Sequence, residues 1–372
     1  MNRKLLPYYL LVAVVMMAMG GIFTLLGELR DQLGFSESGL GFMVAMGFFT
    51  AFFAQIGLAR FSDRGHSTLM LRFGLGSVSI ALALMAVATE LWQFVLLRML
   101  VGLGVGCLIP AARRLVIISD PDNVGANVGR LGAFDVGGFL VGPLVSALLA
   151  NMFSFRAPFI FLAVVTAAFV PTIAKQQIDT GTVSEERQVV RVLLRLPAVR
   201  TMLVGAFGWF AMIGVFESVW AVMLTDRGAD TWLIGVTMSL VMLPMLVIAP
   251  FSGRWAERVG PLRLVILGVL FVAPIFFSFG WIDSLLWLTL LATLQGCGDA
   301  LVFPGSQVGM AVAGPVDLTA SAQGLGGATL ELTAGSMALV SGVLYERFGP
   351  QAVFSLGSGL MLAGVIGALV MA

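Results

Sequence analysis

The segment Arg60-Phe61-Ser62-Asp63-Arg64 returns 194 positions later as Arg254-Trp255-Ala256-Glu257-Arg258. The same shift places Gly102 and Gly104 on Gly296 and Gly298, Pro110 on Pro304, Pro121 on Pro315, and Gly34 and Gly41 on Gly228 and Gly235. These residue types are informative because apolar residues coincide by chance in so hydrophobic a chain. The shift therefore indicates an internal duplication, and it runs without a gap from about Gly20 to Gly132 of the first copy.

The composition indicates that both copies lie in a lipid bilayer. Of the 372 residues, 59% are hydrophobic and 11% are charged, whereas a typical soluble domain carries about 25% charged residues. Mean hydropathy is +1.01, and the net charge of +1 gives no support to a nucleic-acid partner. Cys107 and Cys297 both fall inside apolar segments, so we expect neither a disulfide framework nor a metal site.

Apolar windows of about twenty residues predict twelve transmembrane helices. They cover 6–27, 39–59, 67–88, 91–118, 129–150, 157–174, 200–223, 232–252, 262–282, 285–312, 321–342 and 352–371. The expected fold is an all-α integral membrane protein with a six-helix half at 1–174, a linker at 175–199 and a second half at 200–372. We expect a short surface helix around Arg191–Arg195 in the linker, and a first helix that is retained rather than cleaved.

The basic residues predict the orientation of these helices. Sixteen of them lie on the side of the N-terminus: Arg3, Lys4, Arg60, Arg64, Arg72, Arg113, Arg114, Arg130, Lys175, Arg187, Arg191, Arg195, Arg200, Arg254, Arg258 and Arg263. The four on the other side are Arg30, Arg156, Arg227 and Arg347. Because positive charge collects in cytoplasmic loops, we expect a multi-pass protein of the inner or plasma membrane with both termini in the cytoplasm. We expect it to be a monomer.

Six spans separate equivalent positions, so the two copies have the same orientation in the membrane. Paired parallel repeats place a cavity at their interface near the bilayer midplane, and rocking one repeat against the other exposes that cavity to alternate sides. A bundle with a purely structural role would not need two similar units. The duplication therefore favours a secondary active transporter that works by alternating access.

The loops after the second and eighth spans carry a known signature. Ala59 to His66, which contains Asp63 and Arg64, resembles the signature loop of the major facilitator superfamily, and Gly253 to Arg263 matches it more closely. With the repeat, this makes the chain similar to that superfamily over essentially its whole length. The resemblance implies conformational latches on the cytoplasmic side. They would join Asp63 with Arg60 or Arg64, and Glu257 with Arg254 or Arg258, next to Gly253.

Two further stretches resemble motifs of that superfamily. In the fourth span Arg98 precedes Gly102 and Gly104, and in the fifth span Gly138 precedes Gly142 and Pro143. The second stretch resembles the motif of exporters that exchange substrate for protons. Gly138 and Gly142 lie one above the other on a helix and permit close packing, while Pro143 distorts the helix. An arginine inside the membrane faces either a cavity or an ion partner, and both remain open for Arg98.

Four acids lie well inside predicted spans: Asp135, Glu217, Asp299 and Glu331. Burying a charge in the membrane costs several kcal/mol, so each is a candidate site for protons or substrate, with Gln295 one turn from Asp299. The last three have no basic residue within the second-half spans, which favours proton carriage or attraction of a cation. The alternative is a protonated or hydrogen-bonded packing group; Asp135 in particular would then pair with Arg113, Arg114 or Arg130.

These features predict a proton-coupled transporter that exports a small hydrophobic or cationic compound. The proton gradient would be its driving force, and no cofactor is expected. Proton-coupled uptake of a small metabolite is the alternative within the same class. An enzyme or sensor in the membrane is disfavoured, because the sequence has no His-Glu-x-x-His, Gly-x-Ser-x-Gly or phosphate-binding Gly-Lys motif. Its single histidine, His66, falls in a loop.

Overall fold

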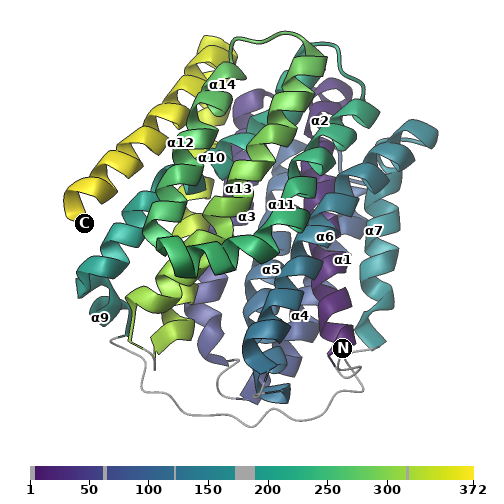
Figure 1. Ribbon diagram of the computed structural model, residues 1–372. Coiled ribbons are helices and arrows are strands. Elements are labelled where there is room, and N and C mark those ends of the chain that lie inside the picture. The colour runs from purple at the N-terminus through teal and green to yellow at the C-terminus, as the bar shows by residue number, and fades with distance from the viewer. Residues whose placement is uncertain (1–4, 62–64, 121–122, 172–188, 316–317) are drawn as a thin grey trace.

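The computed structural model describes residues 5–61, 65–120, 123–171, 189–315 and 318–372, and the regular structure in these ranges is helical. The helices are α1 (Leu6–Thr24), α2 (Leu26–Leu33), α3 (Glu37–Phe61), α4 (Ser67–Met85), α5 (Leu91–Ser119), α6 (Val124–Met152), α7 (Ala157–Ala168), α9 (Val189–Arg195), α10 (Pro197–Asp226), α11 (Thr231–Val259), α12 (Pro261–Ser278), α13 (Leu285–Ala313) and α14 (Thr319–Met371). Figure 1 shows the long helices side by side in one bundle.

Ten of the described helices are long and apolar enough to cross a membrane. One of them, α14, consists of two helices joined at Gly349, whose φ is 75°. The apolar helix α7 is shorter than these ten. When α14 is counted as two helices and α7 is included, the described helices follow the twelve predicted spans in order.

The end of the first span differs from its prediction. A single helix was expected over 6–27, whereas α1 ends at Thr24 and a separate helix, α2, begins at Leu26. The sequence of α2 contains Glu28, Arg30 and Asp31, and these charges favour the membrane surface over the hydrocarbon core. The predicted span 6–27 therefore extended past the end of α1 into the start of α2, the helix that carries these charges.

The turns that follow α2 and α10 are equivalent in the two halves. Gly34 ends α2 with a φ of 71°, and Gly228, which lies 194 positions later, follows α10 with a φ of 82°. Positive φ values are readily adopted by glycine and cost energy for most other residues. Glycine therefore occupies this position in both copies of the repeat because the turn requires a positive φ.

Helix packing inside each half also follows the repeat. In the first half, α5 crosses α3 where a Cβ on Gly102 would overlap the backbone oxygen of Gly47. In the second half, α13 crosses α11 where a Cβ on Gly296 would overlap the backbone oxygen of Val241. Both partners are related by the same shift of 194 residues. The two halves are therefore built around equivalent close contacts between helices.

The halves meet through two equivalent helix pairs, α3 with α14 and α6 with α11. In the first pair, a Cβ on Gly41 would lie 2.6 Å from the backbone oxygen of Ala338. In the second, a Cβ on the equivalent Gly235 would lie 2.6 Å from the backbone oxygen of Pro143. We call the end of the molecule that contains residues 25–38, 226–231 and 345–350 the α2 end, and the opposite end the α9 end.

The short helix expected around Arg191–Arg195 is present as α9. One side of it packs against the second half, because Leu193 is fully buried and lies close to Gly314. The next helix, α10, begins at Pro197, where proline suits the first turn of a helix. Helix α10 thus begins three residues before the span that was predicted from residue 200.

Candidate functional site

Arg98 on α5 has one of the largest fully buried side chains among the described residues, and it carries a charge. Its side chain crosses α3 at Gly47, where a Cβ would lie 2.9 Å from Cζ of Arg98. The Nη1 atom donates to the sulfur of Met19 at 3.2 Å, and Cζ lies 4.9 Å from the ring centre of Phe23. Within the described ranges, Nε and Nη2 have no hydrogen-bond partner. Leaving a buried donor unpaired costs about 1–3 kcal/mol, and more for a charged group.

Two acids of the other half act electrostatically on Arg98. They are Glu217 on α10 and Glu331 on α14. Oε1 of Glu331 accepts a hydrogen bond from Nε2 of Gln55 on α3 at 3.3 Å. Oε2 of Glu217 is buried and lacks a partner among the residues that the structure describes. We call Arg98, Glu217, Glu331 and Gln55 the interface cluster, because its members come from both halves.

Asp299 belongs to a separate group inside the second half. Its Oδ1 accepts a hydrogen bond from Nε1 of Trp209 on α10 at 2.7 Å, and its Oδ2 accepts one from Nε2 of Gln295 at 3.1 Å. The residue is 5% exposed, and no cation pairs with it in the described part of the chain. Neutral donors therefore hold this carboxyl, and Gln295 Oε1 has no partner there.

Asp135 on α6 belongs to neither of these groups. Of its three predicted partners, Arg113 acts on it electrostatically. Arg130 instead donates from Nη1 to Oδ1 of Asn127 at 3.0 Å, and Tyr9 donates to the same oxygen at 3.3 Å. The carboxyl of Asp135 is thus close to a structural cation, unlike that of Asp299.

The glycines of the fifth span lie against α1. A Cβ on Gly138 would overlap the backbone oxygen of Ala13, and one on Gly142 would overlap that of Met17. Pro143 packs beside Gly20 of α1, where a Cβ would lie 2.9 Å from its Cδ. In the fourth span, a Cβ on Gly104 would lie 2.7 Å from the oxygen of Gly74 on α4.

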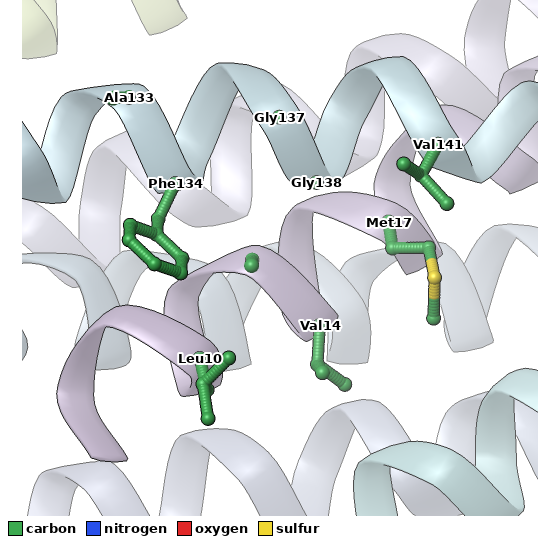
Figure 2. Close-up of a pocket in the computed structure, with 9 residues that line it drawn as sticks. Leu10, Val14, Met17, Ala133, Phe134, Gly137, Gly138 and Val141 are labelled. Carbon is green, nitrogen blue, oxygen red and sulfur yellow. The ribbon is translucent and has the colours of Figure 1, made fainter. Parts of the chain in front are cut away.

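An apolar pocket of about 370 Å³ lies between α1 and α6. Its lining is Leu10, Ala13, Val14, Met17, Ala133, Phe134, Gly137, Gly138 and Val141. Figure 2 shows Leu10, Val14 and Phe134 on facing stretches of the two helices. Because no lining side chain carries a polar group, this pocket suits an apolar group. It shares no residue with the interface cluster.

The predicted latch of the second copy lies toward the α9 end. Asp63 and Arg64 fall outside the described residues, and so does the side chain of Arg60. In the second copy, Arg254, Glu257 and Arg258 are exposed, and Cζ of Arg254 lies 5.6 Å from the ring centre of Phe251. Glu257 forms no ion pair with any residue that the structure describes, and Gly253 has open space around it.

The α2 end holds an ionic network that the sequence analysis did not find. Nη1 of Arg30 lies 2.6 Å from Oδ1 of Asp226 in the other half. The hydroxyl of Tyr345 donates to Oδ2 of the same Asp226 at 2.6 Å. Besides the Arg30–Asp226 pair, two bonds join the halves here: one from Thr231 to Glu28, and one from the Ser38 backbone N–H to Glu346 at 3.0 Å. We call this set the α2-end network.

The electrostatics of this network favour its ion pairs. Burial lowers the pKa of the Arg30 guanidinium, but hydrogen bonds and the charges of Asp226 and Asp31 outweigh burial and raise it above its usual value. Nearby, burial outweighs the charge of Asp283 and lowers the pKa of Arg227. Arg30 is therefore the more firmly charged of the two arginines.

The hydrogen bonds that join the halves are confined to one part of the molecule. Within the described ranges they lie between the α2-end network and the Gln55–Glu331 pair. The described polar contacts between the halves in this conformation therefore lie at the α2 end and in the middle of the molecule.

A family model describes this arrangement. The model of the Major Facilitator Superfamily matches residues 8–240 and again residues 202–372. The chain belongs to the major facilitator superfamily. Both matches follow the duplication, so this major facilitator protein contains the two parallel six-helix repeats of the superfamily.

Curated relatives of this major facilitator protein include multidrug resistance proteins. It is 28% identical over 255 residues to the multidrug resistance protein MdtG of Serratia proteamaculans, a match that covers 66% of this chain and 62% of the relative. It is 27% identical over 287 residues to MdtG of Yersinia enterocolitica, covering 73% and 67% of the two chains. The match to the first of these thus spans less than two thirds of that relative's length.

Solved structures share the fold at low sequence identity. The nucleoside transporter NupG aligns with a TM-score of 0.81 at 14% identity, over 100% of this chain and 99% of NupG. A bacterial homologue of the human lysosomal transporter Spinster, in an inward-facing and occupied conformation, aligns with a TM-score of 0.77 at 16% identity, over 99% and 94%. These likenesses concern the fold alone.

Proposed function

We propose that this protein exports small hydrophobic or cationic compounds in exchange for protons, by alternating access between its two halves. The observation that carries the proposal is that two acids of the second half, Glu217 and Glu331, act electrostatically on the buried Arg98 of the first half. Two carboxyl groups facing one guanidinium exceed its charge when both are ionised. In a low dielectric this excess favours uptake of a proton or of a cation. Competition between the two for the same acids couples their opposite movements.

Several observations support this assignment. Asp299 offers a second buried carboxyl that no described cation neutralises. The sequence relatives are named multidrug resistance proteins, which favours export over uptake. A proton gradient then drives transport without a further cofactor, and the protein acts as a monomer in the inner or plasma membrane with both termini in the cytoplasm.

The same proposal gives the two ends opposite roles. With cytoplasmic termini, the α2 end faces outward, and the present conformation is inward-facing. The latches of Asp63 with Arg60 or Arg64, and of Glu257 with Arg254 or Arg258, close the α9 end in the alternate state. The exposure of Glu257 in this conformation supports that division.

Proton-coupled export is tested with the purified protein in liposomes that carry an interior pH dye and an imposed pH gradient. Lipophilic amines and quaternary ammonium compounds are added to the wild type and to Glu331→Gln and Asp299→Asn. We expect substrate-triggered proton movement in the wild type and at least a tenfold lower rate in Glu331→Gln, because an amide cannot carry the proton. Asp299→Asn is expected to lower the rate in the same direction.

The matched control is Asp283→Asn, since the Asp283 side chain is 95% exposed. Proton movement in this variant should equal that of the wild type. Equal rates in all four proteins would remove Glu331 and Asp299 from the mechanism. A wild type that responds to no cation, but takes up a metabolite with protons, would establish uptake in place of export.

A further inference from the structure

The interface cluster contains two buried polar groups of opposite charge that lack hydrogen-bond partners within the described ranges and that act on one another electrostatically. Arg98 keeps Nε and Nη2 without a hydrogen-bond partner, and Glu217 keeps Oε2 without one, within the described ranges. Arg98 and Glu217 interact electrostatically, yet no direct ion pair joins them in the part of the chain that the structure describes. A group placed between them can satisfy both.

The remaining neighbours of Arg98 do not replace that group. Met19 offers a thioether sulfur, which is a weak acceptor, and Phe23 offers a ring face. Glu331 is already hydrogen-bonded to Gln55. The planar guanidinium, with two adjacent N–H groups free, matches the two oxygens of a carboxylate or a similar oxyanion.

We propose that the transported compound is amphoteric: its anionic oxygens accept hydrogen bonds from Arg98, and its ammonium group donates to Glu217. This inference rests on the proposed export function and narrows its substrate class from simple cations to zwitterions with an apolar body. Arg98 and Glu217 are then the specificity-determining pair. Both are sealed at the α2 end in this conformation, so the substrate reaches them as the halves rock apart.

A matched series of compounds tests this assignment. The probes are phenylalanine and tryptophan as zwitterions, phenethylamine and tryptamine as the amines that lack the carboxylate, and 3-phenylpropionate and indole-3-propionate as the acids that lack the ammonium group. Binding to the purified full-length protein is measured by competition and by thermal stabilisation. We expect the wild type to bind each zwitterion at least tenfold more tightly than its amine or its acid.

The variants separate the two contacts. Arg98→Met is expected to lower the affinity for each zwitterion to that for the amine, and Glu217→Gln to that for the acid. Arg98→Lys keeps the charge but loses the paired N–H donors of the guanidinium. It therefore tests the same contact if Arg98→Met fails to fold, and we expect its affinity for each zwitterion to fall about tenfold. Arg200→Met, an exposed arginine at the start of α10, serves as the control and should keep the wild-type preference.

Equal affinity of the wild type for amine and zwitterion would overturn the inference. So would an Arg98→Lys variant whose affinity falls by the same factor for the zwitterions, the amines and the acids. A water-bridged or state-dependent Arg98–Glu217 pair predicts that result. Proton movement in liposomes is recorded with the same probes. Amine-driven proton movement without a preference for zwitterions leaves the export proposal intact, whereas a preference without proton movement contradicts proton coupling and keeps the amphoteric site.

Discussion

A Gly102→Ala variant is expected to lose about 2 kcal/mol of stability and about 5 °C of its thermal midpoint in detergent. The added methyl group would overlap the backbone oxygen of Gly47. A backbone atom cannot move aside as the tip of a flexible side chain can, so α5 must shift away from α3. That shift also disturbs Arg98, which lies on α5 and against the same Gly47.

The measurement is the thermal midpoint together with the recovery of monodisperse protein by size exclusion. Gly76→Ala on α4 is the matched control, because a Cβ at Gly76 meets no atom within 4 Å. It should be neutral or slightly stabilising, since alanine favours helix over glycine. Gly296→Ala, at the equivalent position of the second half, should behave like Gly102→Ala. Equal midpoints for Gly102→Ala and Gly76→Ala would contradict close contact between α5 and α3.

The fold was largely predictable because glycines with a structural role recur at a fixed spacing of 194 residues in the two copies. Gly102 and Gly296 coincide in the repeat, and both sit where two helices come into backbone contact. Gly34 and Gly228 coincide as well, and both adopt positive φ. Such contacts require glycine, so the sequence retains a visible trace of each of them.

The ends of the helices were less predictable. Hydropathy averages over about twenty residues, so it joined the end of α1 to the start of α2 across Leu25. It also gave α14 as two spans, in agreement with the break at Gly349. Glycine and proline at 349–350 marked that break, whereas no comparable residue marks Leu25.

The candidate site was predictable in its members but not in its groupings. The intramembrane acids were found because a charge in an apolar span is conspicuous. That Glu217 and Glu331 act electrostatically on Arg98, however, depends on how the two halves pack, and their residues are far apart in the sequence. Gln55 and Trp209 were missed because neither carries a charge and neither lies near its partner along the chain.

The α2-end network was missed for a related reason. Arg30, Asp226 and Tyr345 stand at the ends of different helices, where polar residues are expected on the membrane surface. Only the assembled fold shows that Asp226 accepts from both Arg30 and Tyr345. In the sequence, Arg30 counted simply as one of the few basic residues on the outer side.

Asp226→Ala is expected to open the α2 end about tenfold more often than the wild type. The change removes the bonds from Arg30 and Tyr345 together. The side chain of Asp226 is 40% exposed, so solvent screening limits the loss to about 1.4 kcal/mol. Opening is measured as the rate at which a charged, membrane-impermeant thiol reagent labels Thr24→Cys from the outer side, in a background with Cys107 and Cys297 replaced by serine.

Thr24 suits this measurement because it is fully buried and its hydroxyl contacts Met238 across the two halves. Asp31→Asn is the matched control: Asp31 also pairs with Arg30, at 3.0 Å, but both belong to the first half. Its labelling rate should stay within about twofold of the wild type, as expected for an exposed pair. If Asp31→Asn accelerated labelling as much as Asp226→Ala, loss of any acidic partner of Arg30 would explain the effect, and the α2-end network would not hold the halves together.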